Sequence, residues 1–209
     1  MDIHIESPKD RAQDPLITAA LSEDNEPVTL HILRYDNHIY DVFSGDHSLK
    51  LLAHLQSLPK PKLIVYDSGT NAINQALAHC EFTETGLNDI GYAKSLGGKQ
   101  NTLWWSDMDQ NTPISSQYRF TAFVYFPSQA SGTLSNASGP RHFIWKRTSR
   151  LILVDEETDT VAAIAHDITT VSTNCGTLHI LVPFGDNFSL TVLTTFLTIC
   201  EKATENTKR

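Results

Sequence analysis

The stretch Ser189-Leu-Thr-Val-Leu-Thr-Thr-Phe-Leu-Thr-Ile-Cys200, near the C-terminus, decides the fold. At about 100° per residue, its apolar residues fill one broad side of a helix. The four inner threonines fall together on the remaining narrow arc: Thr191, Thr194, Thr195 and Thr198. In a strand the same threonines would divide evenly between two faces. The pattern therefore predicts a helix from Ser189 to Cys200, and the polar residues from Glu201 onward are expected to emerge into solvent.

This helix is not expected to be stable by itself in water. Six of its twelve residues are β-branched, which lowers its stability by roughly 2–4 kcal/mol relative to alanine, and short isolated helices are marginal. Burial of its seven apolar side chains contributes on the order of 10–20 kcal/mol. Threonine hydroxyls can bond to the helix's own carbonyls. We therefore expect the helix inside the protein, wrapped by a sheet, with a helix packed on one face of a sheet as the alternative.

The rest of the chain reads mainly as strands separated by polar turns. Alternation from Val28 to Leu33, a turn at Asp36-Asn37 and the run Ile39 to Phe43 predict a hairpin. Further strands are expected at Leu63–Tyr66, Thr102–Trp105, Arg119–Phe126, His142–Arg147, Leu151–Asp155, Val161–His166 and Thr177–Val182.

Three stretches give weaker patterns. Leu49 to Leu58 fits either a helix or a strand. Asn71 to Cys80 is expected as a short helix, because its apolar residues gather on one helical side. The residues from Gly86 up to the strand at Thr102 are expected as loop.

Composition limits the classes of protein that fit. The 209 residues carry a net charge of −8, which argues against a general nucleic-acid binder. Residues 1–27 hold seven Asp or Glu against two Lys or Arg, so we expect an acidic tail at 1–27 and one domain at 28–209. The three cysteines, Cys80, Cys175 and Cys200, lack CxxC spacing and are expected as buried thiols in a reducing compartment. No secretory signal and no transmembrane segment is expected. We therefore expect a cytoplasmic protein, with peripheral membrane association left open.

A local pattern suggests a family. Phe143-Ile144-Trp145-Lys146-Arg147 is followed by Leu151-Ile-Leu-Val-Asp-Glu-Glu-Thr158 and by Val161-Ala-Ala-Ile164. With the final helix, this order resembles the tubby C-terminal-like superfamily, which includes phospholipid scramblases and LURP-one-related proteins, and it is most similar to the uncharacterised fungal members. The resemblance covers about residues 140–200 by motif and 28–126 by strand rhythm. It implies a mainly β fold, a closed antiparallel β-barrel around a hydrophobic C-terminal helix, with a few short helices.

Residues 141–150 are the strongest candidate for a binding site. They contain four cations and no acidic residue: Arg141, Lys146, Arg147 and Arg150. Such a patch can hold phosphate or an anionic head group, and the resemblance to tubby domains implies phosphoinositides. Phosphate-binding residues of that family occupy a Gly-Lys-x-Arg setting, and here Gly98-Lys99 is kept while Asn101 replaces the Arg. Lys99 therefore joins the candidate anion site. A solvated strand edge that discourages aggregation is the alternative for 141–150.

The remaining alternatives concern catalysis and metal binding. Cys175 lies close in sequence to His179 and could act as a nucleophile if the two side chains met. His31, His38 and Asp41 could approach one another across the first hairpin, but no metal-ligand spacing is present, so we expect no metal and no cofactor. The expected function is a non-enzymatic module that binds an anionic lipid, such as a phosphoinositide, or a protein partner. A cysteine-dependent hydrolase and a purely structural scaffold are the alternatives, and the oligomeric state stays open.

Overall fold

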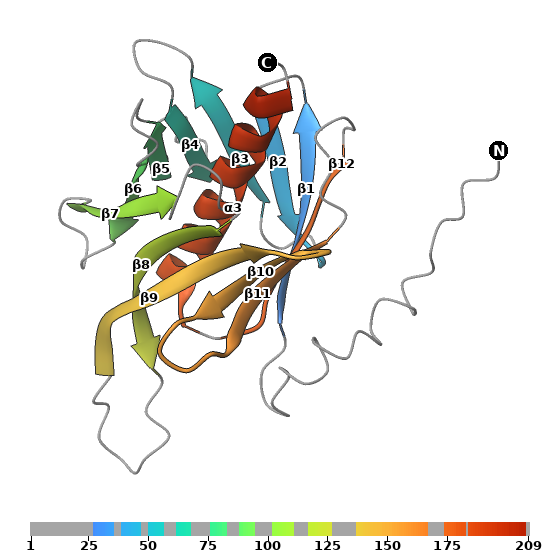
Figure 1. Cartoon of the computed structure of the whole chain (residues 1–209). Coiled ribbons are helices and arrows are strands. Elements are labelled where there is room, and N and C mark those ends of the chain that lie inside the picture. Colours follow the sequence, from blue (N-terminus) through green and yellow to red (C-terminus); the bar gives the residue numbers. More distant parts are fainter. Residues whose placement is uncertain are drawn as a thin grey trace.

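The protein consists of antiparallel strands followed by one long helix (Figure 1). The computed structural model describes residues 27–35, 39–46, 50–56, 62–67, 76–82, 88–94, 102–110, 117–126, 137–166, 174–182 and 184–207. The helix of this part is α3 (Asp186–Thr207). The strands are β1 (Val28–Tyr35), β2 (Ile39–Ser44), β3 (Lys50–Gln56), β4 (Lys62–Asp67), β5 (Ala76–Phe82), β6 (Asn88–Lys94), β7 (Thr102–Gln110), β8 (Gln117–Phe126), β9 (Ala137–Arg147), β10 (Leu151–Asp155), β11 (Val161–His166) and β12 (Asn174–Ile180).

Each strand pairs with its neighbours in the sequence, and β1 pairs with β12 as well as with β2. α3 contacts β4, β5, β6, β8 and β12, which come from distant parts of this pairing order. In Figure 1 the red helix runs behind β9, β10 and β11 and in among the other strands. The predictions of a mainly β protein and of a buried C-terminal helix are therefore confirmed.

The core forms where the inner sides of the strands meet α3. Alternate residues of each strand point inward, because successive side chains of a strand face opposite sides. Every residue from Thr191 to Glu201 is buried. The largest side chains that are fully buried are Trp145, Tyr40, Phe120, Phe143, Phe188 and Phe196. α3 is thus buried around almost its whole circumference, and this burial stabilises a helix that is not expected to be stable alone.

The threonines of α3 satisfy their hydroxyls within the helix. Thr191 donates to the carbonyl of Asn187 at 2.8 Å, and Thr198 donates to the carbonyl of Thr194 at 2.8 Å. Thr195 donates to the carbonyl of Val192 at 2.9 Å. These bonds let a polar stripe lie in the core without unsatisfied donors.

Several sequence-based expectations were wrong. The stretch expected as a short helix contains β5 instead, in which Cys80 pairs with Leu63 and His79 pairs with Ile64. The expected loop after Gly86 contains β6. Both are strands because strand partners on each side supply hydrogen bonds that local periodicity does not reveal. The ambiguous stretch around Leu51 is strand β3.

The final helix is also longer than expected. It continues to Thr207, and Glu201 and Thr204 are buried, not in solvent, with 3% and 6% of their surfaces exposed. In the described part, no helix has the length and apolar character that crossing a bilayer requires. Residues 1–26, with the expected acidic tail, lie outside the described residues, so the division at residue 27 stays a prediction.

Candidate functional site

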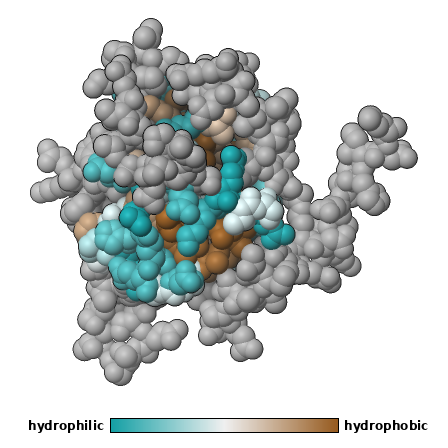
Figure 2. Space-filling model, in the orientation of Figure 1, coloured by the Kyte–Doolittle hydropathy of each residue, from teal (hydrophilic) through white to brown (hydrophobic). Residues whose placement is uncertain are grey.

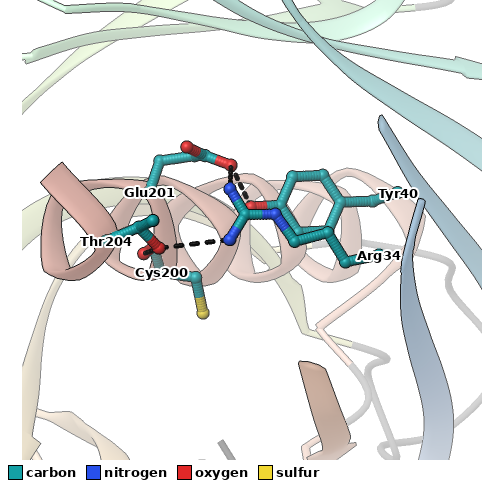
Figure 3. A network of polar contacts seen from close by, with 5 residues as sticks. All are labelled: Arg34, Tyr40, Cys200, Glu201 and Thr204. Carbon is teal, nitrogen blue, oxygen red and sulfur yellow. Dashed lines mark hydrogen bonds and ion pairs between the residues drawn. The ribbon is translucent and has the colours of Figure 1, made fainter. Parts of the chain in front are cut away.

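A buried polar network joins the end of α3 to the first two strands (Figure 3). The Nη2 atom of Arg34 lies 3.0 Å from Oε1 of Glu201, and its Nη1 atom donates to Oγ1 of Thr204 at 3.2 Å. The hydroxyl of Tyr40 donates to the same Glu201 oxygen. Arg34 and Glu201 are only 7% and 3% exposed. One carboxylate oxygen therefore links α3 to β1 and to β2 inside the protein.

The alternation of β1 explains how a charge comes to lie there. Leu30 and Ile32 point into the core, and Arg34 is the next inward position. Burying a guanidinium is costly unless a carboxylate accompanies it, and Glu201 on α3 supplies one. Burial and then the negative charge of Glu201 raise the pKa of Tyr40. Tyr40 consequently stays protonated and donates to Glu201, so the network links α3 to β1 and β2.

The two cysteines near this network are poor nucleophiles. Burial raises the pKa of Cys175 to about 11, and burial raises that of Cys200 further above its usual value. Because the thiolate is the reactive form of cysteine, both thiols are nearly unreactive at neutral pH.

The structure does not bring Cys175 and His179 together. A bulge in the β1–β12 pairing matches Ile32 with Gly176 and Leu33 with Asn174, which leaves Cys175 as the extra residue. Cys175 joins the main core, whereas the Nδ1 atom of His179 lies 3.1 Å from Oγ1 of Thr29 on the other face of the sheet. A Cys–His dyad is not formed in this arrangement.

The basic stretch 141–150 is divided into two places. Arg141 is on the inward row of β9, where it donates to Asp155 and its Nε atom lies 3.6 Å from Oε2 of Glu157. Its guanidinium also lies 5.7 Å from the ring centre of Phe184. Arg141 is thus held by two carboxylates and an aromatic ring near the start of α3.

The other three cations surround the turn between β9 and β10, roughly 20 Å from Arg141 along an extended strand. We call Lys146, Arg147 and Arg150 the hairpin cations. Lys146 pairs in register with Ile152 and Arg147 with Leu151, while Arg150 closes the turn by accepting from the Thr148 amide at 2.7 Å. Within the described residues, no carboxylate makes an ion pair with Lys146 or Arg147.

Two residues that the sequence did not single out lie beside the hairpin cations. Burial raises the pKa of Tyr118, and the charge of Arg147 partly offsets that rise. The Nζ atom of Lys202 on α3 lies 5.8 Å from the ring centre of Tyr118. Lys202 was missed from the sequence because the predicted helix ended at Cys200; a helix predicted to continue further would have included it. Arg147 and Lys202 therefore bring positive charge close to Tyr118, near the C-terminal part of α3.

Other candidate residues are placed elsewhere or not described. Lys99 and His38 lie outside the described residues. The ring of His31 packs on Phe43 with 5.5 Å between ring centres. In the described part of the chain, His, Cys, Asp and Glu side chains nowhere gather in threes in a way that could hold a metal ion.

Comparison with known proteins adds only weak support, at the level of the fold. No family model and no curated protein matches this chain. Among solved structures, the X-ray structure of a protein from Arabidopsis thaliana is similar, with 10% sequence identity and a TM-score of 0.46, covering 88% of this chain and 92% of that chain.

Proposed function

We propose that this chain is a non-enzymatic module that binds the anionic phosphate head group of a lipid, with a phosphoinositide as the ligand class, through the hairpin cations. The main observation behind this proposal is that Arg141 lies apart from the three hairpin cations. Arg141 is held by Asp155 and Glu157, whereas Lys146 and Arg147 have no ion pair with a carboxylate of the described residues and lie with Arg150 around the β9–β10 turn of a protein whose net charge is −8. We place this binding in the cytoplasm, at the membrane surface.

The scaffold we propose is a closed barrel of the tubby-like kind. Pairing of β1 with both β2 and β12 supports this closure. Because α3 packs the inner side of the sheet, a ligand has to bind on the outside or at an end. The hairpin turn is such an end, and Thr148 and Ser149 in it are exposed.

The expected strength follows from general electrostatics. Each Lys or Arg close to an anionic membrane surface contributes about 1 kcal/mol. The three hairpin cations then contribute roughly 3 kcal/mol, which is about a hundredfold in affinity. Arginine adds forked donors that match phosphate oxygens. Binding that weakens with salt is expected, since exposed charges are screened.

Vesicle sedimentation tests the proposal. Wild-type protein is expected to sediment with phosphatidylcholine vesicles that contain a phosphoinositide and not with phosphatidylcholine alone. Arg147→Glu together with Arg150→Glu should abolish sedimentation. Arg119→Glu together with Lys50→Glu is the matched control, because it changes the net charge equally at sites on β8 and β3. Equal binding by both double variants would show that the hairpin cations do not form the binding site. Absence of any wild-type binding would favour a protein partner or a purely structural scaffold.

A further inference from the structure

The turn that joins β9 to β10 presents two hydroxyl side chains among the hairpin cations. The chain here runs Lys146-Arg147-Thr148-Ser149-Arg150. Thr148 and Ser149 are both exposed. In Figure 2, hydrophilic side chains, in teal, gather on the face that β9, β10 and β11 present, beside apolar ones in brown. The turn therefore offers alcohol oxygens to solvent inside a group of positive charges.

The two hydroxyls of the turn are not equivalent. Oγ1 of Thr148 donates to the carbonyl of Arg150 at 3.2 Å and accepts from the amide of Arg150 at 3.3 Å. Both bonds tie the Thr148 side chain to the backbone of the turn. Within the described residues, the hydroxyl of Ser149 makes no hydrogen bond. The oxygen of Ser149 is therefore the one that can react with a partner while the bonds that close the turn stay intact.

We propose that Ser149 is a phosphorylation site for a protein kinase that recognises basic substrates, and that the added phosphate turns off the anion site. The second part rests on the proposed function. In the reaction, Oγ of Ser149 forms a bond to the γ-phosphorus of ATP, and the bond from that phosphorus to the β–γ bridging oxygen breaks. ADP leaves with the electron pair of the broken bond, and the hydroxyl proton passes to the carboxylate base of the kinase.

The charge pattern before Ser149 supports the first part of the proposal. Lys146 and Arg147 lie three and two residues before it. Kinases select substrates by such charge patterns, and carboxylates of a kinase cleft would pair with these cations. Within the part of the chain that the structure describes, neither Lys146 nor Arg147 makes an ion pair with a carboxylate. An acidic cleft would therefore not have to displace an ion pair of the described structure.

The charge of a phosphate explains how it would turn off the anion site. Phosphoserine carries about −1.5 to −2 at neutral pH, against the three positive charges of the hairpin cations. Arg147 and Arg150 stand on either side of Ser149 in the sequence, and guanidinium groups match phosphate oxygens as forked donors. One charge near an anionic membrane surface changes affinity roughly fivefold, so phosphorylation should weaken binding about ten- to thirtyfold.

Phosphorylation of the folded, full-length protein tests the first part. The protein is incubated with ATP and the catalytic subunit of cyclic-AMP-dependent protein kinase, which selects basic residues two and three positions before the acceptor. Peptide mass spectrometry should find phosphate on Ser149 and none there in Ser149→Ala. Thr148→Ala is the matched control and should be phosphorylated on Ser149 as the wild type is, whereas Arg147→Ala should lower kcat/KM. Phosphate on Thr148 instead, or none on Ser149, would overturn the proposal.

Vesicle sedimentation of the phosphorylated protein tests the second part. Binding to phosphoinositide vesicles should be about ten- to thirtyfold weaker than that of the unmodified protein, and a phosphatase should restore it. Ser149→Asp should weaken binding roughly fivefold. Thr158→Asp, the same change in the exposed turn after β10, should leave binding nearly unchanged.

The outcomes separate this proposal from the proposed function. If the unmodified protein does not bind these vesicles, the proposed function and the second part fail together, while the mapping of Ser149 still decides the first part. If the unmodified protein binds and the phosphorylated protein binds equally well, the proposed function stands and the switch is refuted.

Discussion

Removal of the Glu201 carboxylate is expected to be the most damaging single polar change in the protein. In Glu201→Ala the guanidinium of Arg34 stays buried, at 7% exposure, without the carboxylate that now lies 3.0 Å from it. The hydroxyl of Tyr40 loses its acceptor, because it donates to the same oxygen of Glu201. The change therefore removes the carboxylate that neutralises a buried guanidinium and the acceptor of a buried hydroxyl.

Breaking a buried pair by removing one partner typically lowers the unfolding free energy by about 3–5 kcal/mol. That is a large part of the roughly 5–15 kcal/mol that stabilises most domains. Glu201→Gln keeps the shape and one acceptor oxygen, so its effect should be smaller, about 1–3 kcal/mol. Arg34→Met combined with Glu201→Leu removes both charges and should be less damaging than the two single changes added together.

Urea unfolding followed by circular dichroism gives these free energies, provided that the slope with urea is the same in each variant. The control is Glu156→Ala, which breaks the exposed Arg119–Glu156 pair and should change stability by less than about 1 kcal/mol. If Glu201→Ala is no more destabilising than Glu156→Ala, the network does not hold α3 in the way described.

Three further predictions follow from single contacts. Burial raises the pKa of Cys175 from 9.0 to about 11. The stabilisation that comes from keeping this thiol protonated is therefore complete below pH 9 and is lost as the pH rises toward 11. The unfolding free energy should fall over that interval in pH-dependent unfolding experiments, and Cys175→Ala should lessen the fall. Thr195→Val leaves the indole donor of Trp145, now 2.9 Å from its acceptor, unsatisfied and should lower the unfolding free energy by about 1–3 kcal/mol. In Thr194→Val only a bond to the helix's own carbonyl is lost, so an equally large effect there would contradict the assignment. Arg141→Ala should lower the melting temperature, because it leaves a buried carboxylate, yet keep vesicle sedimentation; loss of sedimentation in the folded variant would place Arg141 in the anion site.

The sequence predicted the helix and most strands because their periodicity is local. The apolar residues of Ser189–Cys200 repeat with the helical period, and Arg119–Phe126 alternates as a strand does. β5 and β6 were missed because short, Gly-containing or mixed segments become strands only through their partners. The end of α3 was missed because Glu201 reads as a solvent residue until Arg34, 167 positions earlier, is known to be beside it.

For the candidate site, the sequence reveals a local excess of cations but not how these side chains are arranged. Four cations within ten residues are visible in the sequence, but strand geometry separates Arg141 from Arg147, and the pairing partners decide which cation is held by carboxylates. Likewise the closeness of Cys175 and His179 in sequence says nothing of the bulge after Ile32 that turns them to opposite faces. Such features depend on register, which a single sequence does not specify.

The position of α3 after the strands that it packs against has a consequence for how this protein is made. Synthesis proceeds from the N-terminus, so the strands leave the ribosome before the helix that fills their inner side exists. Until Asp186–Thr207 has emerged, the inward row of each strand has nothing to pack against. The sheet can therefore pack fully only after α3 has been synthesised, and a chain that stops before Glu201 would lack the end of this helix and its ion pair with Arg34. Chains truncated before Glu201 are therefore expected to aggregate or to be degraded and not to give a smaller folded product.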